Sequence, residues 1–311
     1  MDNGSNFQSV GSAPLANPAR LGSIGVGSWT FPWAIGTVRE HQPPKPLTAA
    51  GLVRKARDLG AHTAQLVDNL PLDQLSPEEL HELKGTAREC GIALEVGTRG
   101  VNPAHLLRYL EIARFLEAKL VRTMAGWPGS APPLTEVEAN LREVLPQFAQ
   151  AGIAIGMENY ETYPVAELAG LIRRINHPNL GVCLDVSNSL GALESKDAIL
   201  DALAPLTINV HVKDISVERL PYLMGFAFYG RPAGQGRLPF EEIFSRAAKT
   251  DRVLNATIEL WTPFTGSLEQ TLALEETWAR ASIDYLSKLP WFAPCNPQPP
   301  VTGTGRWPGG G

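Results

Sequence analysis

Short apolar segments recur eight times along the chain, and longer stretches with a helical spacing of apolar residues separate them. Each short segment has the length and composition of a buried strand. Most of them follow one another at the spacing of one strand-helix unit, and only the last interval is clearly longer. We expect strands to begin near Ile24, His62, Ile92, Leu120, Ile153, Leu180, Ile208 and Asn255.

Residues that start and stop helices fill the intervals between these strands. The run Ser76-Pro77-Glu78-Glu79 is a capping box with proline at the first helical position. Gly60, Gly91 and Gly152 stand where helices should end before the next strand. Regular alternation of strands and helices predicts a parallel sheet, and eight units predict its closure. The predicted fold is therefore α/β, a single (β/α)8 TIM barrel.

Four successive strands end in a residue that can bind a metal ion. Side chains alternate between the two faces of a strand, so these residues also show which face points inward. Their neighbours on the same face are small or polar, as Gly156 is, and the opposite face is apolar, as at Met157. In a closed parallel barrel the carboxyl ends of the strands meet at one mouth, where catalytic groups lie. The four residues are Glu158, Asp185, His211 and Glu259.

Three carboxylates and one imidazole form a hard ligand set. Such a set favours Mn²⁺, Mg²⁺ or Co²⁺ over the softer environment of a structural zinc site. Each residue alone is more often a strand-end cap, a salt-bridge partner or a core histidine. Four of them on one face of consecutive strands favour a site for one divalent ion, with Mn²⁺ as our first choice, and three carboxylates would repel one another without it.

Cationic side chains accompany this cluster and indicate an anionic substrate. Arg99 and Arg122 follow or end the third and fourth strands, while Lys213 and Arg231 belong to the seventh strand and its loop. A guanidinium group matches the geometry of a carboxylate or phosphate. The alternative is that each cation pairs with a protein carboxylate. The glycine-rich run 230–237 does not follow a strand as a phosphate loop would, so a sugar acid is preferred to a sugar phosphate.

Other residues near the expected mouth are candidates for substrate contact. Trp29 is one of several aromatic residues that could pack against a sugar ring, and His62 stands beside the second strand. Asn188 follows Asp185 by three residues. The segment 214–238 is too long for a simple connection, and we expect it to fold over the site.

Composition restricts the partners and the compartment. A net charge of −5 and only six histidines argue against a nucleic-acid-binding protein and against a multi-zinc nuclease. Three cysteines without a close pair favour a reducing, cytoplasmic location. The first twenty residues lack the pattern of a secretory leader, and we expect no membrane-spanning segment because no apolar run has the required length. We expect disorder at 1–20 and in the Pro/Gly-rich tail 291–311, with the catalytic barrel at 21–290. A homo-oligomer is compatible with this composition.

Four strand-end motifs resemble the xylose-isomerase-like sugar isomerase/epimerase superfamily of TIM barrels. The motifs are GMENY (156–160), CLDVSNS (183–189), NVHVKD (209–214) and IELW (258–261), and the resemblance extends from about Ile24 to Leu289. It implies that Glu158, Asp185, His211 and Glu259 hold the metal. It also implies that the two glutamates act as an acid/base pair around an enediolate that the metal stabilises.

The chain departs from the ketose epimerases of this superfamily at two positions. Those enzymes usually have a histidine three residues after the aspartate and an arginine six residues after the histidine, where this chain has Asn188 and Val217. Short segments instead resemble a branch of 3-oxo-isoapionate decarboxylase-like proteins, among them FPWAIG (31–36), EVGTRG (95–100) and ELWTPF (259–264).

That branch implies loss of CO₂ from a 3-oxo sugar acid such as 3-oxo-isoapionate, giving a ketose such as L-erythrulose. Decarboxylation and isomerisation share an enediolate, so a keto-sugar isomerase, epimerase or dehydratase with the same metal site is the alternative. A non-catalytic sugar-binding protein would instead bind the metal without turnover.

Overall fold

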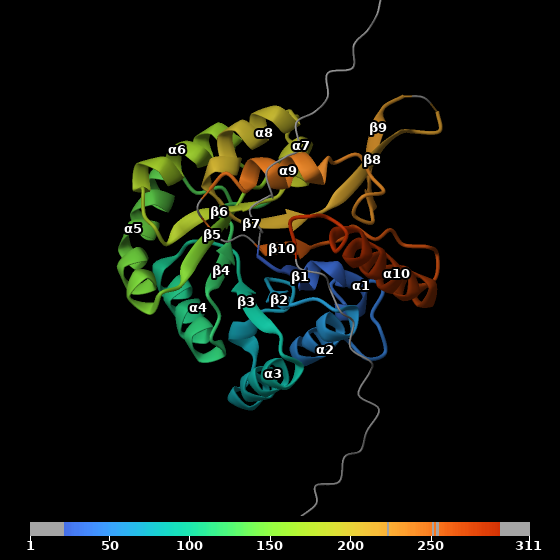
Figure 1. The fold of residues 1–311 in the computed structure, drawn as a ribbon, viewed down its shortest axis with the longest axis horizontal. Coiled ribbons are helices and arrows are strands. Elements are labelled where there is room, and N and C mark those ends of the chain that lie inside the picture. Colours follow the sequence, from blue (N-terminus) through green and yellow to red (C-terminus); the bar gives the residue numbers. More distant parts are fainter. Residues whose placement is uncertain (1–21, 223, 251, 253–254, 293–311) are drawn as a thin grey trace, which may run out of the picture.

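The computed structural model describes residues 22–222, 224–250, 252 and 255–292. Eight parallel strands close into a barrel with the order β1-β10-β7-β6-β5-β4-β3-β2, as seen in Figure 1. The predicted (β/α)8 TIM barrel is therefore confirmed. The barrel strands are β1 (Ile24–Gly27), β2 (Thr63–Leu66), β3 (Ala93–Gly97), β4 (Leu120–Thr123), β5 (Ala154–Glu158), β6 (Leu180–Leu184), β7 (Thr207–Val212) and β10 (Asn255–Ile258).

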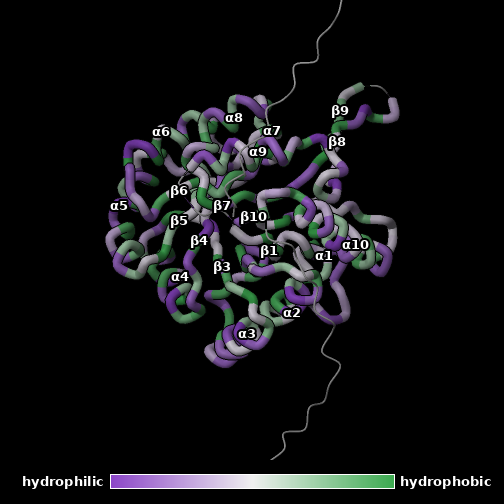
Figure 2. The backbone as a smooth tube through the Cα atoms, viewed as in Figure 1, coloured by the Kyte–Doolittle hydropathy of each residue, from purple (hydrophilic) through white to green (hydrophobic). Residues whose placement is uncertain are grey.

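A ring of helices surrounds the barrel, and Figure 2 shows that hydrophilic positions are most frequent on this outer ring. The helices bury one face against the strands, whose outward residues such as Ile155 and Met157 belong to the same apolar core. The longer helices are α2 (Ala49–Leu59), α3 (Pro77–Cys90), α4 (Pro103–Leu116), α5 (Leu134–Ala151), α6 (Val165–Ile175), α8 (Lys196–Leu203), α9 (Phe240–Ala247) and α10 (Leu268–Leu286). Short helical turns occur at η1 (Ser28–Thr30), α1 (Pro32–Ile35), η2 (Leu72–Gln74), α7 (Val186–Gly191) and η3 (Ala204–Leu206).

Local sequence determines where several helices begin and end. Both hydrogen bonds of the capping box at Ser76 and Glu79 are present at the start of α3. Gly60, Gly91 and Gly152 adopt the left-handed conformation directly after α2, α3 and α5, as predicted. None of the described helices combines the length and apolarity needed to cross a membrane.

The long segment after β7 forms a hairpin of β8 (Asp214–Arg219) and β9 (Phe226–Arg231). Figure 1 shows that it projects from the rim, so the expectation that this segment folds over the site is wrong. The base of the hairpin explains its direction. The Asp214 carboxylate accepts hydrogen bonds from the backbone N–H groups of Gly234, Gly236 and Leu238, which holds the returning loop at the rim.

The predicted disordered termini lie almost entirely outside the described residues. Of the predicted tail, Trp291 and Phe292 are described. The Phe292 ring is buried and packs edge to face on Phe244 at 5.0 Å between centroids. The packed part of the chain therefore reaches at least this residue.

Candidate metal centre and active site

The four predicted ligands meet at the carboxyl ends of four neighbouring strands. Glu158 ends β5, His211 lies on β7, and Asp185 and Glu259 directly follow β6 and β10. One ligand atom from each lies within 4.8 Å of the others, and all four side chains are buried. The pleat of the strands and their parallel direction therefore place these residues at one point, as the sequence predicts.

The residues fit a divalent ion. His211 Nδ1 is 3.4 Å from Glu259 Oε1 and 3.5 Å from Glu158 Oε2. His211 Nδ1 and Glu259 Oε1 are buried, and neither has a hydrogen-bond partner in the described part of the chain. Leaving such acceptors dry and unpartnered is costly, whereas a hard cation would satisfy three carboxylates and one imidazole together.

A buried amide determines how the His211 ring is oriented. Its Nε2 lies 2.8 Å from Gln65 Oε1, and an amide oxygen can only accept, so Nε2 carries the proton. Nδ1 then offers its lone pair to the centre. Gln65 is held in turn, because its Nε2 donates to Glu95 Oε2 over 2.9 Å. Partners of this kind fix the tautomer of metal-binding histidines.

Arg122 holds Glu158 from the other side. Its Nε and Nη2 both contact Glu158 Oε2, and its Nη1 lies 3.0 Å from Asp68 Oδ1. Burial alone would raise the pKa of Glu158, but the groups around the carboxylate, with the Arg122 guanidinium first among them, together outweigh burial and lower that pKa. Glu158 is thus kept as a carboxylate.

Lys213 reaches the same centre from the end of β7. Its Nζ is 2.7 Å from Asp185 Oδ2 and 2.9 Å from Glu259 Oε2. Burial would lower the pKa of Lys213, but these two carboxylates outweigh it and raise that pKa, so the amine stays charged. The ammonium group also lies over the Trp261 ring, 5.2 Å from its centroid.

A cavity of about 130 Å³ opens onto the ligand cluster. Of the predicted substrate residues, it is lined by Trp29, Arg99, Arg122, Asn188 and Lys213. Of the four ligands, Glu158 and Glu259 line it. A larger cavity of about 430 Å³ lies at the amino ends of the strands, but the ligand cluster and the chemistry of such barrels belong to the carboxyl ends.

Asp68 connects the two arginines of the cavity. Its Oδ2 is 2.8 Å from Arg99 Nη2, and its Oδ1 accepts from Arg122. The two arginines differ in exposure, since the side chain of Arg122 is 2% exposed and that of Arg99 is 42% exposed. Arg99 therefore has donors left for a substrate, whereas the fork of Arg122 is already occupied.

Comparison with known proteins agrees with this geometry. Residues 53–289 match the family described as xylose isomerase-like TIM barrel. The chain belongs to this family. The sequence is 34% identical over 264 residues to 3-oxo-isoapionate decarboxylase of Pectobacterium atrosepticum, covering 85% of this chain and 94% of that protein.

Solved structures of the family share the fold at low sequence identity. A xylose isomerase-like TIM barrel protein from Mycobacterium smegmatis in complex with magnesium has a TM-score of 0.62 and 16% identity, covering 85% of this chain and 97% of that one. A D-psicose 3-epimerase, determined in the presence of D-fructose, has a TM-score of 0.66 and 14% identity, covering 86% and 99% of the two chains.

Asn188 occupies the place where ketose epimerases of the family usually have histidine. It lies on α7, and its Nδ2 donates to Glu158 Oε1 over 2.8 Å. The Asp185 carboxylate caps the same helix by accepting from the Asn188 backbone N–H. Asp185 therefore serves both as a helix cap and as a member of the cluster. The other departing position, Val217, lies on the projecting hairpin.

Two predicted substrate residues lie away from the cavity. Arg231 is on the hairpin, where it pairs with Glu218. His62 precedes β2, and its backbone oxygen accepts from the Ala93 N–H at the amino end of the barrel. A side chain at the start of a parallel strand is at the opposite end from the mouth, so His62 was wrongly placed by its nearness to β2 in sequence.

Two cavity residues were not predicted, namely Met124 and Tyr160. Each lies two residues after an inward-facing residue, Arg122 and Glu158 respectively. Extending the strand alternation by one more step past the strand ends would have found both of them.

Proposed function

We propose that this protein is a divalent-metal-dependent carboxy-lyase that acts on a 3-oxo sugar acid, such as 3-oxo-isoapionate, and releases CO₂ and a ketose such as L-erythrulose. The observation that carries the proposal is that Arg99, which has donors left for a substrate, lines one cavity with Glu158 and Glu259. Such a cavity suits an anionic sugar derivative. The similarity to a 3-oxo-isoapionate decarboxylase over most of both chains supports the same reaction.

The metal would be held by Glu158, Asp185, His211 and Glu259. When bound there, a divalent ion supplies Lewis-acid polarisation of the substrate ketone and its neighbouring hydroxyl. The hard ligand set supports Mn²⁺ first, with Mg²⁺ or Co²⁺ as alternatives. The magnesium complex of a protein with the same fold is compatible with this choice.

Arg99 is assigned to the substrate carboxylate. It lines the cavity, its side chain is partly exposed, and in this structure one nitrogen pairs with Asp68. A bidentate contact would orient the carboxylate so that the bond to be broken stands perpendicular to the plane of the ketone and overlaps with its π orbitals. That bond then breaks, CO₂ leaves, and the electron pair moves onto the ketone oxygen to give an enediolate.

A protein group must then return a proton to carbon. Arg122 and the other groups around Glu158 keep it ionised, so we assign Glu158 to holding the centre and Glu259 to the proton transfer at carbon. Lys213 lies 2.9 Å from Glu259 Oε2 and stabilises the carboxylate that remains after the transfer, and solvent returns the proton to Glu259. The reaction then balances, with one proton taken up and one CO₂ released.

The second candidate is a keto-sugar isomerase, epimerase or dehydratase. The observation that favours it is that Glu158 and Glu259 face one cavity from different strands, as an acid/base pair acting on one sugar carbon would. Asn188 and Val217 weigh against an ordinary ketose epimerase.

The proposal also includes an anionic substrate and a cytoplasmic location. The location is expected from the odd number of cysteines.

The test is incubation of the Mn²⁺-loaded protein with 3-oxo-isoapionate carrying a ¹³C-labelled carboxylate. We expect labelled CO₂ and L-erythrulose in equal amounts, and no reaction with D-psicose. A product that retains all its carbon atoms would replace the lyase with the isomerase or epimerase. Metal binding without turnover of either substrate would reject both.

A further inference from the structure

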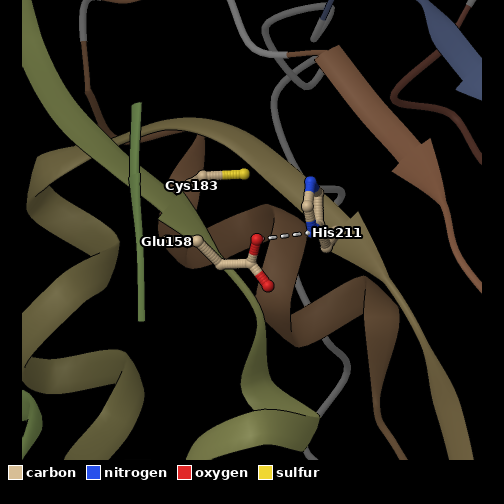
Figure 3. Close-up of side chains that lie close together, drawn as sticks. All are labelled: Glu158, Cys183 and His211. Carbon is tan, nitrogen blue, oxygen red and sulfur yellow. Dashed lines mark ion pairs between the residues drawn. The ribbon is translucent and has the colours of Figure 1, made fainter. Parts of the chain in front are cut away.

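A buried thiol lies inside the candidate metal centre. Cys183 is on β6, two residues before Asp185, and shares its inward face. Figure 3 shows its Sγ beside the Glu158 carboxylate and the His211 ring. One ligand atom from each of Glu158, Cys183 and His211 lies within 4.8 Å of the others, and all three residues are buried.

The local strand geometry directs this thiol into the centre. The register between β6 and β7 shifts between Val182 and Cys183, and Cys183 then pairs with Asn209. The thiol donates to Asn209 Oδ1 over 3.2 Å, a weak hydrogen bond that a metal ion can replace. Irregular pairing of this kind often re-aims a side chain beside a functional site.

Two overlapping ligand sets result, and they differ in chemistry. Asp185 and Glu259 complete a hard set with Glu158 and His211. Cys183 completes a smaller and softer set with the same two residues. Thiolate ligands select thiophilic ions, whereas a set of carboxylates and one imidazole suits Mn²⁺ or Mg²⁺.

We propose that Glu158, Cys183 and His211 form a second metal position, one layer deeper in the barrel, that takes thiophilic divalent ions such as Zn²⁺ or Cd²⁺. Binding replaces the thiol proton, which leaves to solvent, by the metal ion. The two positions exclude each other because both require Glu158 and His211. An ion in the deeper position therefore displaces the hard ion, and this consequence rests on the proposed four-ligand site.

The direct test is a Cd²⁺ titration of the metal-free, full-length protein. We expect an ultraviolet charge-transfer band from sulfur to cadmium at one ion per chain. Cys183→Ser and Cys183→Ala should both lose the band and weaken Cd²⁺ binding by at least roughly tenfold. Cys90→Ser is the matched thiol control, since Cys90 is on α3, outside the barrel, and should leave the band intact.

A competition measurement tests the mutual exclusion. Adding Cd²⁺ to the Mn²⁺-loaded protein should release Mn²⁺, seen as the sharp electron paramagnetic resonance signal of the free ion. In the Cys183 variants release should need at least roughly ten times more Cd²⁺. Thermal melts of both variants show whether they remain folded.

The possible failures can be told apart. Asp185→Asn should lose Mn²⁺ binding and keep the cadmium band, because Asp185 belongs only to the hard set. A band that survives both Cys183 variants, or no band in the wild type, would overturn the deeper site. If 3-oxo-isoapionate is not decarboxylated but the band depends on Cys183 alone, the proposed function fails and this site stands.

Discussion

Two groups of buried carboxylates lie in the same barrel, and their partners differ. Near the amino ends of the strands, Glu95 accepts hydrogen bonds from the side-chain amides of Asn255, Gln65 and Asn209 at 2.7, 2.9 and 3.3 Å. Near the carboxyl ends, Glu158 and Glu259 face His211, other carboxylates and cations. Glu95 is a satisfied acid, whereas the upper group includes acceptors that have no donor among the described residues.

Hydrogen-bond partners distinguish structural carboxylates from functional ones better than burial does. All these acids are nearly inaccessible to water, so burial alone would treat them alike. Neutral amide donors satisfy the Glu95 oxygens and offset part of the desolvation, so this carboxylate does not need a metal ion as a partner. In the upper group Arg122 and Lys213 pair with the carboxylates but leave Glu259 Oε1 and His211 Nδ1 without a donor, so this group is where a metal ion is expected.

The largest effect on turnover is expected from Glu259→Gln. Gln keeps the size of the side chain but cannot transfer the proton, so kcat should fall by roughly a hundred- to ten-thousandfold. Turnover in D₂O should place deuterium on carbon in the wild-type product. Glu95→Gln is the matched change in the lower group and should keep most activity. Equal losses in the two variants would remove the distinction between the groups.

Arg99→Met should lower kcat/KM on a 3-oxo sugar acid by roughly ten- to a hundredfold, because a charge-assisted contact with the carboxylate is lost. Steady-state kinetics measures this. Arg231→Met is the matched control, since this arginine pairs with Glu218 on the hairpin and should leave kcat/KM unchanged. If both variants behave alike, Arg99 has no special part in substrate binding.

Gln65 joins the two groups, because it contacts His211 above and Glu95 below. Gln65→Leu removes the acceptor that fixes the imidazole tautomer, so Mn²⁺ affinity should fall by roughly tenfold. Isothermal titration calorimetry gives the affinity. An unchanged value would show that the ring is oriented without Gln65.

The smallest effect concerns the pH dependence of stability. Burial raises the pKa of Glu95 above its ordinary value of 4.5, although its amide partners oppose the shift. The folded state therefore holds this proton more tightly, and the contribution to stability is full below pH 4.5 and is lost as pH rises through the folded-state pKa. The free energy of unfolding of Glu95→Gln, measured in urea, should depend less on pH over this range and should be about 1 kcal/mol lower than that of the wild type. A slope identical to that of the wild type would assign the effect to another group.

Strand periodicity predicted the arrangement of the metal-type ligands because it depends only on local geometry. Alternation of side chains put Glu158 and Asp185 on the inner face, and parallel strand ends brought them to one mouth. The same rule, carried one step further, would have included Tyr160. Neglecting which end of β2 a residue occupies led to the wrong placement of His62.

Features that depend on tertiary contacts were not predictable in this way. The direction of the β8–β9 hairpin follows from three backbone hydrogen bonds to Asp214 and from Gly230, where an added Cβ would lie 2.2 Å from the Trp261 oxygen. The pairing of Arg99 with Asp68 depends on side-chain conformation across two strands. Neither has a signal in the spacing of residues.

The most direct test of the account is the metal content of three proteins after Mn²⁺ loading and gel filtration, measured by inductively coupled plasma mass spectrometry. Asp185→Asn keeps the cap of α7 but removes a charged ligand, so it should retain almost no Mn²⁺. The wild type and Glu95→Gln should each retain one ion per chain. Full retention by Asp185→Asn, or equal loss in both variants, would contradict the assignment of the upper carboxylates to the metal.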